Sequence, residues 1–271
     1  MTNYRIGLKL FTALVLLVQT GYAQKTDWEK MNLKGKIKSI VQIEYQIGED
    51  TEDESRMIYS FDAGGYLTNE LSEDRTGNLI YKKTYTYDKQ KRISAETEVD
   101  NLVGVTINTA NKYNAAGKLE KVTVKVKKDV IKTYIYTYGS DGNISNIELL
   151  KPAGLLTENF ARKYDANGNP AEEIHTEGDE YKKIVYRYDE HNRLTAKEEY
   201  NKSDRMRYKT EYEYDPSGNV SRESSGYVGG NAIPTVFNYV YEYDKDGNWT
   251  SVREQSEGKT FNVVMRRIAK Y

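Results

Sequence analysis

Few side chains in this sequence could perform catalysis. The chain of 271 residues has no Cys and two His, so thiol chemistry is excluded. A hydrolase triad needs a nucleophile beside an oriented base. His175 lies near an expected loop and His191 in an expected turn, and we interpret both as surface residues without a catalytic role. The 41 Asp and Glu include no pair that stands out as a glycosidase pair. We therefore expect no enzymatic activity and no cofactor.

Acidic turns could bind calcium, and two of them are Asp165-Ala-Asn-Gly-Asn169 and Asp244-Lys-Asp-Gly-Asn248. An EF-hand loop has Gly at its sixth position and Glu at its twelfth, whereas Gly is fourth in these segments. Asp accepts backbone N–H groups at the start of a turn, and Gly adopts the positive φ that follows. We predict tight hairpin turns and no metal site, with calcium binding as the weaker alternative.

These turns belong to a repeat of roughly 26 residues that occurs eight times. Each copy has an aromatic residue directly before an anchor position, usually a second aromatic two residues earlier, and Gly three residues after the anchor in six copies. Lys91 and Asn192 replace that Gly in the other two copies. The anchors are Asp62, Asp88, Asn114, Gly139, Asp165, Asp189, Asp215 and Asp244. The aromatics before them are Phe61, Tyr87, Tyr113, Tyr138, Tyr164, Tyr188, Tyr214 and Tyr243.

The repeat predicts an all-β fold of tandem hairpins. Aromatic residues at i and i+2 lie on one face of a strand. Each unit has two strands and two turns, and residues 36–47 and 261–271 add a first and a last strand, which makes about eighteen. Open sheets of more than about ten strands curl because strands twist. We expect a curled antiparallel meander or β-spiral with the tyrosines packed in ladders as its core.

The chain is predicted to have three parts. Residues 1–23 resemble a secretory signal peptide, because a basic start precedes the apolar run 10–18 and the small residues Gly21 and Ala23. That run is too short for the ~20 residues of a membrane-spanning helix. Residues 24–34 form a lead in which Thr26 and Glu29 have capping-box spacing. Residues 35–271 form a single repeat domain, secreted to the periplasm or cell surface.

Charge argues against two classes of partner. Without Arg5 and Lys9 of the signal segment, 38 Lys and Arg remain against 41 Asp and Glu. Nucleic-acid binding needs a basic surface, so we expect none. An outer-membrane barrel suits the number of strands, but its lipid face must be apolar. The segment Lys121-Val-Thr-Val-Lys-Val-Lys127 carries polar residues on both faces. We therefore expect no membrane contact beyond the signal segment and treat a membrane barrel as the less favoured alternative.

The repeat columns resemble the YD repeat, also called the Rhs repeat, over residues 57–253. Its motif Y-x-Y-D-x-x-G-N-L is clearest in Tyr212-Glu-Tyr-Asp-Pro-Ser-Gly-Asn-Val220 and Tyr241-Glu-Tyr-Asp-Lys-Asp-Gly-Asn-Trp249. The resemblance implies a β-spiral, as in exported toxins, insecticidal-toxin shells and teneurins, and carbohydrate binding. The repeat here is longer than usual, and we expect no toxin-like segment after it. A short stand-alone form from a Gram-negative bacterium is expected, with too few hairpins for a closed shell.

Two functions follow as hypotheses. In the first, exposed aromatics stack on a glycan or another cell-surface polymer. The candidate residues are Trp249, Tyr243, Tyr241, Tyr214 and Tyr212, although packing is the favoured role for each. In the second, free sheet edges pair with another chain, and the bases at residues 36–38 and 266–267 guard them. The residues assigned to the repeat framework are Tyr87, Asp88, Tyr138, Tyr164, Asp165, Gly168, Tyr188, Asp189, Asp215, Gly218, Asp244 and Gly247.

Overall fold

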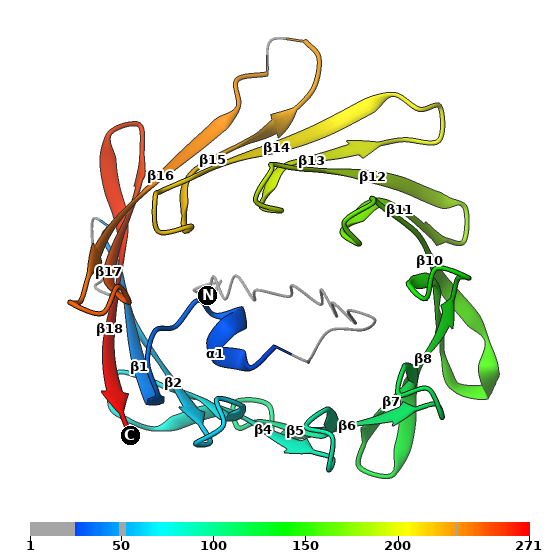
Figure 1. Cartoon of the computed structure of the whole chain (residues 1–271), viewed down its shortest axis with the longest axis horizontal. Helices are drawn as coiled ribbons and strands as arrows, with labels where there is room; N and C mark the ends of the chain where they lie inside the picture. The colour runs from blue at the N-terminus through cyan, green and yellow to red at the C-terminus, as the bar shows by residue number, and fades with distance from the viewer. Residues whose placement is uncertain (1–24, 49–52, 231) are drawn as a thin grey trace.

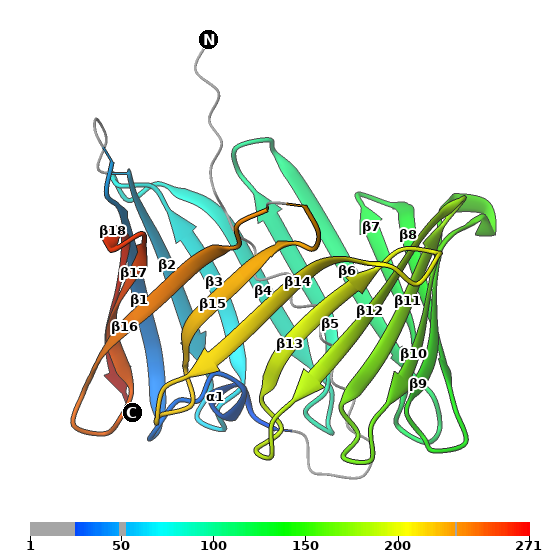
Figure 2. The same cartoon turned by 90° about the horizontal axis from the view of Figure 1, so that it is seen from above.

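The protein is an antiparallel β-barrel of eighteen strands (Figures 1 and 2). The structure, a computed structural model, describes residues 25–48, 53–230 and 232–271, so the predicted signal segment 1–23 lies outside the described residues. The prediction of an all-β meander of about eighteen strands is confirmed. The strands are β1 (Ile37–Gln46), β2 (Asp53–Phe61), β3 (Leu67–Glu73), β4 (Leu79–Tyr87), β5 (Ile93–Asp100), β6 (Val105–Tyr113), β7 (Leu119–Val126), β8 (Asp129–Tyr138), β9 (Ile144–Leu150), β10 (Leu156–Tyr164), β11 (Pro170–Glu177), β12 (Glu180–Tyr188), β13 (Leu194–Tyr200), β14 (Met206–Tyr214), β15 (Val220–Tyr227), β16 (Thr235–Tyr243), β17 (Trp249–Ser256) and β18 (Lys259–Lys270).

The sheet closes on itself because β1 pairs with both β2 and β18. Strands β2 to β17 each pair with their two neighbours in the sequence, and β18 pairs with β17 and β1. The expectation that eight hairpins are too few concerned a closed hollow shell; whether the sheet itself closes was open, and the added first and last strands complete its ring. The hypothesis of partner binding through free edges is overturned, since the bases at residues 36–38 and 266–267 lie at a paired seam. Closure removes the edges that another chain could extend.

The eight repeat turns form one rim of the barrel, which we call the turn rim (lower edge in Figure 2). In the turn after β10, the N–H of Gly168 donates to the carbonyl oxygen of Asp165 at 3.1 Å. The Asp165 carboxylate accepts the N–H groups of Asn167 and Asn169 at 2.9 and 2.8 Å. Gly168 has φ +82°, and Lys91 and Asn192 adopt φ 62° and 60° at the equivalent positions. The predicted roles of Asp and Gly in the turn are therefore seen in its hydrogen bonds and backbone angles.

The other connections between strands form the opposite rim, which we call the loop rim. They include the turn at Asp74, the 3-10 turn η1 (Pro152–Gly154) and the two-residue turns after β7, β11 and β17. The only α-helix among the described residues, α1 (Asp27–Lys30), lies inside the ring at the turn rim (Figure 1). Thr26 and Glu29 cap it with the reciprocal hydrogen bonds of a capping box.

The position of α1 shows which face of each strand points inward. Trp28 of α1 packs on Phe61, with ring centroids 6.5 Å apart, and the Tyr87 hydroxyl oxygen lies 3.1 Å from the Asp27 carboxylate. Residues directly opposite each other on paired strands lie on the same face of the sheet. The inward face of one strand therefore identifies the inward face of the next, all the way around the ring. The aromatic column before the turns therefore lies on the inner face, which also contains both buried clusters.

Candidate functional site

The inner face near the turn rim is built by a recurring tyrosine hydrogen bond. The tyrosine that ends one hairpin's first strand donates its hydroxyl to the carbonyl oxygen of the residue that begins the return strand of the previous hairpin. Neighbouring hairpins are thereby linked by side chains as well as by the ladder. The pairs are Tyr87 to Leu67 at 2.8 Å, Tyr113 to Ile93 at 2.9 Å, Tyr138 to Leu119 at 2.8 Å and Tyr214 to Leu194 at 2.7 Å.

Several of these rings are also covered by a cation from the preceding turn. The guanidinium of Arg92 lies 4.1 Å from the centre of the Tyr113 ring, and the Lys118 ammonium lies 4.9 Å from that of Tyr138. Arg193 covers Tyr214 at 4.8 Å. Such cation–π contacts add about 0.5–2 kcal/mol each. The side chain directly after the turn glycine, or its substitute, therefore has a packing role that the sequence columns did not reveal.

Burial keeps the tyrosine side chains of the inner face neutral. Desolvation raises the pKa of Tyr138 and of Tyr188 to about 12, and the neighbouring Tyr164 and Asp165 add to these shifts respectively. Tyr212 also has a pKa of about 12, from desolvation and the nearby Glu223. These phenols therefore remain protonated hydrogen-bond donors at neutral pH. The inner face therefore presents aromatic rings and neutral hydroxyl groups rather than charged phenolates.

Three of the five predicted ligand residues lie together at the turn rim. The Tyr241 ring is 6.0 Å from Trp249 and 6.1 Å from Tyr243. Tyr243 is 36% exposed, and Asn219 donates to its hydroxyl at 2.8 Å, while that hydroxyl donates to Asp215. The cluster of Tyr241, Tyr243 and Trp249 is called the aromatic cluster below. It combines an open ring with a fixed carboxylate and amide.

Trp249 is less accessible than its predicted role required. The Arg266 guanidinium lies 3.4 Å from the centre of its ring, and Arg266 also donates to the Gln42 side chain at 3.0 Å. Burial lowers the pKa of Arg266 to about 10, which still leaves it charged at neutral pH. One face of Trp249 is therefore occupied by a cation, and Tyr243 is the more open ring of the cluster.

The other two predicted ligand residues lie one hairpin away on β14. Tyr212 is opposite Glu223, and the Tyr214 hydroxyl is bonded to the Leu194 carbonyl. Neither ring makes a ring–ring contact with the aromatic cluster among the described residues. The framework residues predicted with them lie in the strand ends and turns described above, and His191 lies in the turn after β12.

Paired charges form a second inner feature, which sequence reasoning missed. Arg162 and Glu173 are 2.5 Å apart on β10 and β11. Lys83 lies 2.6 Å from Glu96 and 3.0 Å from Glu98. Opposite charges on directly or diagonally facing residues stabilise a strand pair. Charged residues on these strands point inward and outward in alternation. The inward pairs could therefore be identified only from the register of β4 with β5 and of β10 with β11.

The outer face is charged across the height of the barrel. Lys209 and Glu211 form an ion pair at 2.6 Å in the middle of β14, and both point outward. Arg253 pairs with Glu242 at 2.9 Å between β16 and β17. Similar outward pairs join Lys112 to Glu120, Lys163 to Glu172 and Arg222 to Glu213. The outer face therefore carries charged pairs in the middle of its strands as well as near their ends.

Hydrogen bonds attach the lead to the repeat turns at the turn rim. Backbone N–H groups of Asp27 and Trp28 donate to the Gly65 carbonyl at 2.9 and 3.2 Å. Farther along, the Lys34 backbone makes two hydrogen bonds to the nearly buried Asn248 side chain, at 2.6 and 3.1 Å. The Asn32 side chain reaches the Ser217 carbonyl at 3.2 Å. The lead therefore bridges three of the repeat turns.

Comparisons with known proteins give only distant likenesses. No model of a protein family matches the chain, and no curated protein matches it. A porin-like protein from Bacteroides uniformis ATCC 8492 is 13% identical over 87% of this chain and 99% of its own, with a TM-score of 0.46. A porin-like protein from Bacteroides vulgatus ATCC 8482 is 11% identical over 87% and 98%, with a TM-score of 0.41.

A third solved structure is the complex TcdB2-TccC3-TEV, which is 14% identical over 83% of this chain with a TM-score of 0.26. The chain spans only 19% of that structure's length. No helix among the described residues is long and apolar enough to cross a membrane. Since the three TM-scores lie below 0.5, the role of the inner face is interpreted from its own contacts.

Proposed function

We propose that this chain is an exported, non-catalytic binding protein whose barrel presents the aromatic cluster to a carbohydrate or another cell-surface polymer. The observation that supports this proposal is the exposed Tyr243 ring, which lies beside Tyr241. Its hydroxyl is hydrogen-bonded to Asp215 and Asn219. Sugars bind where an aromatic face lies beside polar groups that fix hydroxyls. The YD-like repeat and the signal-like segment support the same placement in the periplasm or at the cell surface.

The size of the barrel supports an accessible inner face. In barrels of 16–18 strands, side chains no longer fill the interior. The exposed inner residues extend to the loop rim, where Tyr227 is 72% exposed and makes an edge contact with Tyr208 at 5.2 Å. A polymer that enters from the loop rim would therefore meet aromatic rings at both ends of β14–β16.

The test is binding of purified glycans to the chain without residues 1–23. A glycan array identifies ligands, and titration with one of them should change the fluorescence of Trp249 in a Trp28→Phe background. Tyr243→Ala should weaken binding about tenfold or more, because stacking and the fixed hydroxyl are both lost. Tyr45→Ala is the matched control, because Tyr45 lies on the outer face of β1, opposite Val263. An empty array together with unchanged fluorescence contradicts the proposal.

A second candidate is an outer-membrane barrel, favoured by the closed ring and the even number of antiparallel strands. The outward Lys209–Glu211 and Arg253–Glu242 pairs weigh against it. Lys or Arg at the middle of a lipid face costs about 2–4 kcal/mol each. The discriminating measurement is size-exclusion chromatography with circular dichroism: a folded, monodisperse chain without detergent rejects the membrane barrel, and folding only in detergent favours it.

A further inference from the structure

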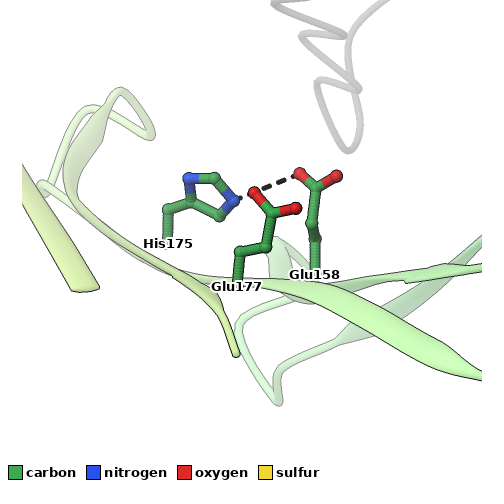
Figure 3. Close-up of side chains that lie close together, drawn as sticks. All are labelled: Glu158, His175 and Glu177. Atoms are coloured by element: carbon green, nitrogen blue, oxygen red, sulfur yellow. Dashed lines mark hydrogen bonds and ion pairs between the residues drawn. The ribbon is translucent and has the colours of Figure 1, made fainter. Parts of the chain in front are cut away.

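A second cluster on the inner face lies away from the aromatic cluster, toward the loop rim. Glu158 on β10 and His175 and Glu177 on β11 point to the same side of the sheet (Figure 3). One nitrogen of His175 and one oxygen from each carboxylate lie within 4.8 Å of one another. Imidazole and two carboxylates are a ligand set found for first-row divalent metal ions.

The charge balance of this cluster differs from that of the other inner carboxylates. Glu158 and Glu177 are directly opposite each other, and like charges at such positions destabilise a strand pair. Among the described residues neither forms an ion pair with Lys or Arg, whereas the neighbouring Glu173 is held by Arg162. Lys182, opposite His175, pairs instead with Glu199 at 3.9 Å. Among the described residues, the strand register therefore places two carboxylates opposite each other with His175 as their ionisable neighbour and no Lys or Arg paired with them.

The histidine is held in an orientation that suits a ligand. Its ring stacks on Phe160 at 4.3 Å with planes 7° apart, which fixes the imidazole plane. The same ring places Nε2 3.2 Å from the Glu158 carboxylate. Two nitrogen or oxygen ligands on one tetrahedral zinc, each about 2.0–2.1 Å from it, lie ~3.3 Å apart, so this pair already has the separation that a shared ion requires.

We propose that Glu158, His175 and Glu177 form a binding site for a divalent transition-metal ion, of which Zn²⁺ is the probe. Three protein ligands leave a coordination position free, and the residues face the barrel interior. The Glu177 side chain is exposed and closes on the ion by rotation, because it stands at the end of β11. The site is independent of the aromatic cluster, so its failure would leave the glycan proposal untouched.

The experiment is calorimetric titration of ZnCl₂ into the chelator-treated chain without residues 1–23. One saturable site is expected. His175→Gln and Glu177→Gln should each weaken it by more than about tenfold, since even an outer partner of a metal ligand is worth ~10–100-fold. His191→Gln is the matched control, because His191 is the only other histidine and lies in an exposed turn beside Glu190.

Circular dichroism of each metal-free variant separates loss of ligand from loss of fold. Glu177→Gln removes an exposed charge from a like-charged pair, so it should fold at least as well as the wild-type chain. Absence of a saturable site in the wild-type chain overturns the proposal. Equal weakening by His175→Gln and His191→Gln, or full affinity in folded Glu177→Gln, overturns it as well.

Discussion

The hydroxyl of Tyr138 donates a 2.8 Å hydrogen bond to the carbonyl oxygen of Leu119, nineteen residues earlier at the start of the neighbouring hairpin's return strand. Leu119 is fully buried, and Tyr138 packs against the cluster that contains it. The repeat is therefore fastened to its predecessor by a side chain whose spacing is set by the repeat itself. This explains why tyrosine rather than phenylalanine dominates the column.

Replacing Tyr138 with Phe should lower the free energy of unfolding by about 0.5–1.5 kcal/mol, the net contribution of one hydrogen bond. The ring and its contact with Lys118 are kept, so the change isolates the hydroxyl. Chemical denaturation followed by circular dichroism measures the effect. Tyr227→Phe is the control and should be neutral, because Tyr227 is 72% exposed. Equal effects of the two substitutions would contradict a role for the interhairpin bond.

An alanine should be tolerated less well at Gly65 than at the equivalent Gly168. Both have a positive φ, +86° and +82°, which costs an alanine about 1–2 kcal/mol. A Cβ on Gly65 would also lie 2.6 Å from the Trp28 ring, whereas a Cβ on Gly168 meets nothing within 4 Å. Gly65→Ala is therefore expected to displace α1, seen as a red shift of Trp28 fluorescence. Gly168→Ala should destabilise the barrel without that shift.

Stability should fall in acid through the turn carboxylates. Hydrogen bonds from the Thr76 and Asn78 side chains and from backbone N–H groups lower the pKa of Asp74 to about 2. A lowered carboxyl pKa gives stability that is present above the unfolded value near 4 and is lost as pH falls toward 2. Asp74→Ala should be less stable at neutral pH and lose less stability between pH 4 and pH 2.

The same sign applies to Asp189, whose pKa is lowered by the backbone N–H of Arg193 and by the Arg193 side chain, against the effect of burial. Thermal unfolding at intervals between pH 5 and pH 2 checks both positions. Asp179→Ala, in the turn after β11, is the control, because its carboxylate makes no hydrogen bond to that turn among the described residues. A pH profile of Asp74→Ala that parallels the wild type would refute the assignment.

Removing Arg266 should uncover Trp249. In a Trp28→Phe background Trp249 is the single indole, and Arg266→Met takes the guanidinium off its ring while keeping an apolar side chain. We expect a red-shifted emission and greater quenching by acrylamide. Arg267→Met changes the adjacent, exposed and outward-pointing residue and should alter neither. Quenching that is the same in both variants would show that Arg266 does not shield the indole.

Local chemistry made much of the fold predictable from the sequence. The turn at Asp165 follows from the hydrogen-bonding reach of Asp and the conformational freedom of Gly168, both of which depend only on neighbours in the chain. Closure did not follow, because it depends on whether the accumulated twist brings β18 to β1. No single residue encodes that angle.

The site was less predictable for a similar reason. Tyr241, Tyr243 and Trp249 belong to one hairpin, so their proximity could be anticipated. Arg266 over Trp249, and Glu158 beside His175, join residues 17 apart through a register that local patterns leave open. Side chains alternate between the two faces of a strand, so the pair Glu158 and His175 could have been found once the register between β10 and β11 was known.

The seam between β1 and β18 also constrains how the barrel comes into being. Asn262 donates to Glu44 across it, a separation of 218 residues, and both strands are hydrogen-bonded along their length. During folding, β1 keeps one side unpaired until β18 is available to pair with it. Until then the chain exposes an open sheet edge. In the finished ring β1 and β18 are neighbours, so a circular permutant opened at a loop-rim turn should assemble the same ring with a different strand left unpaired until the end.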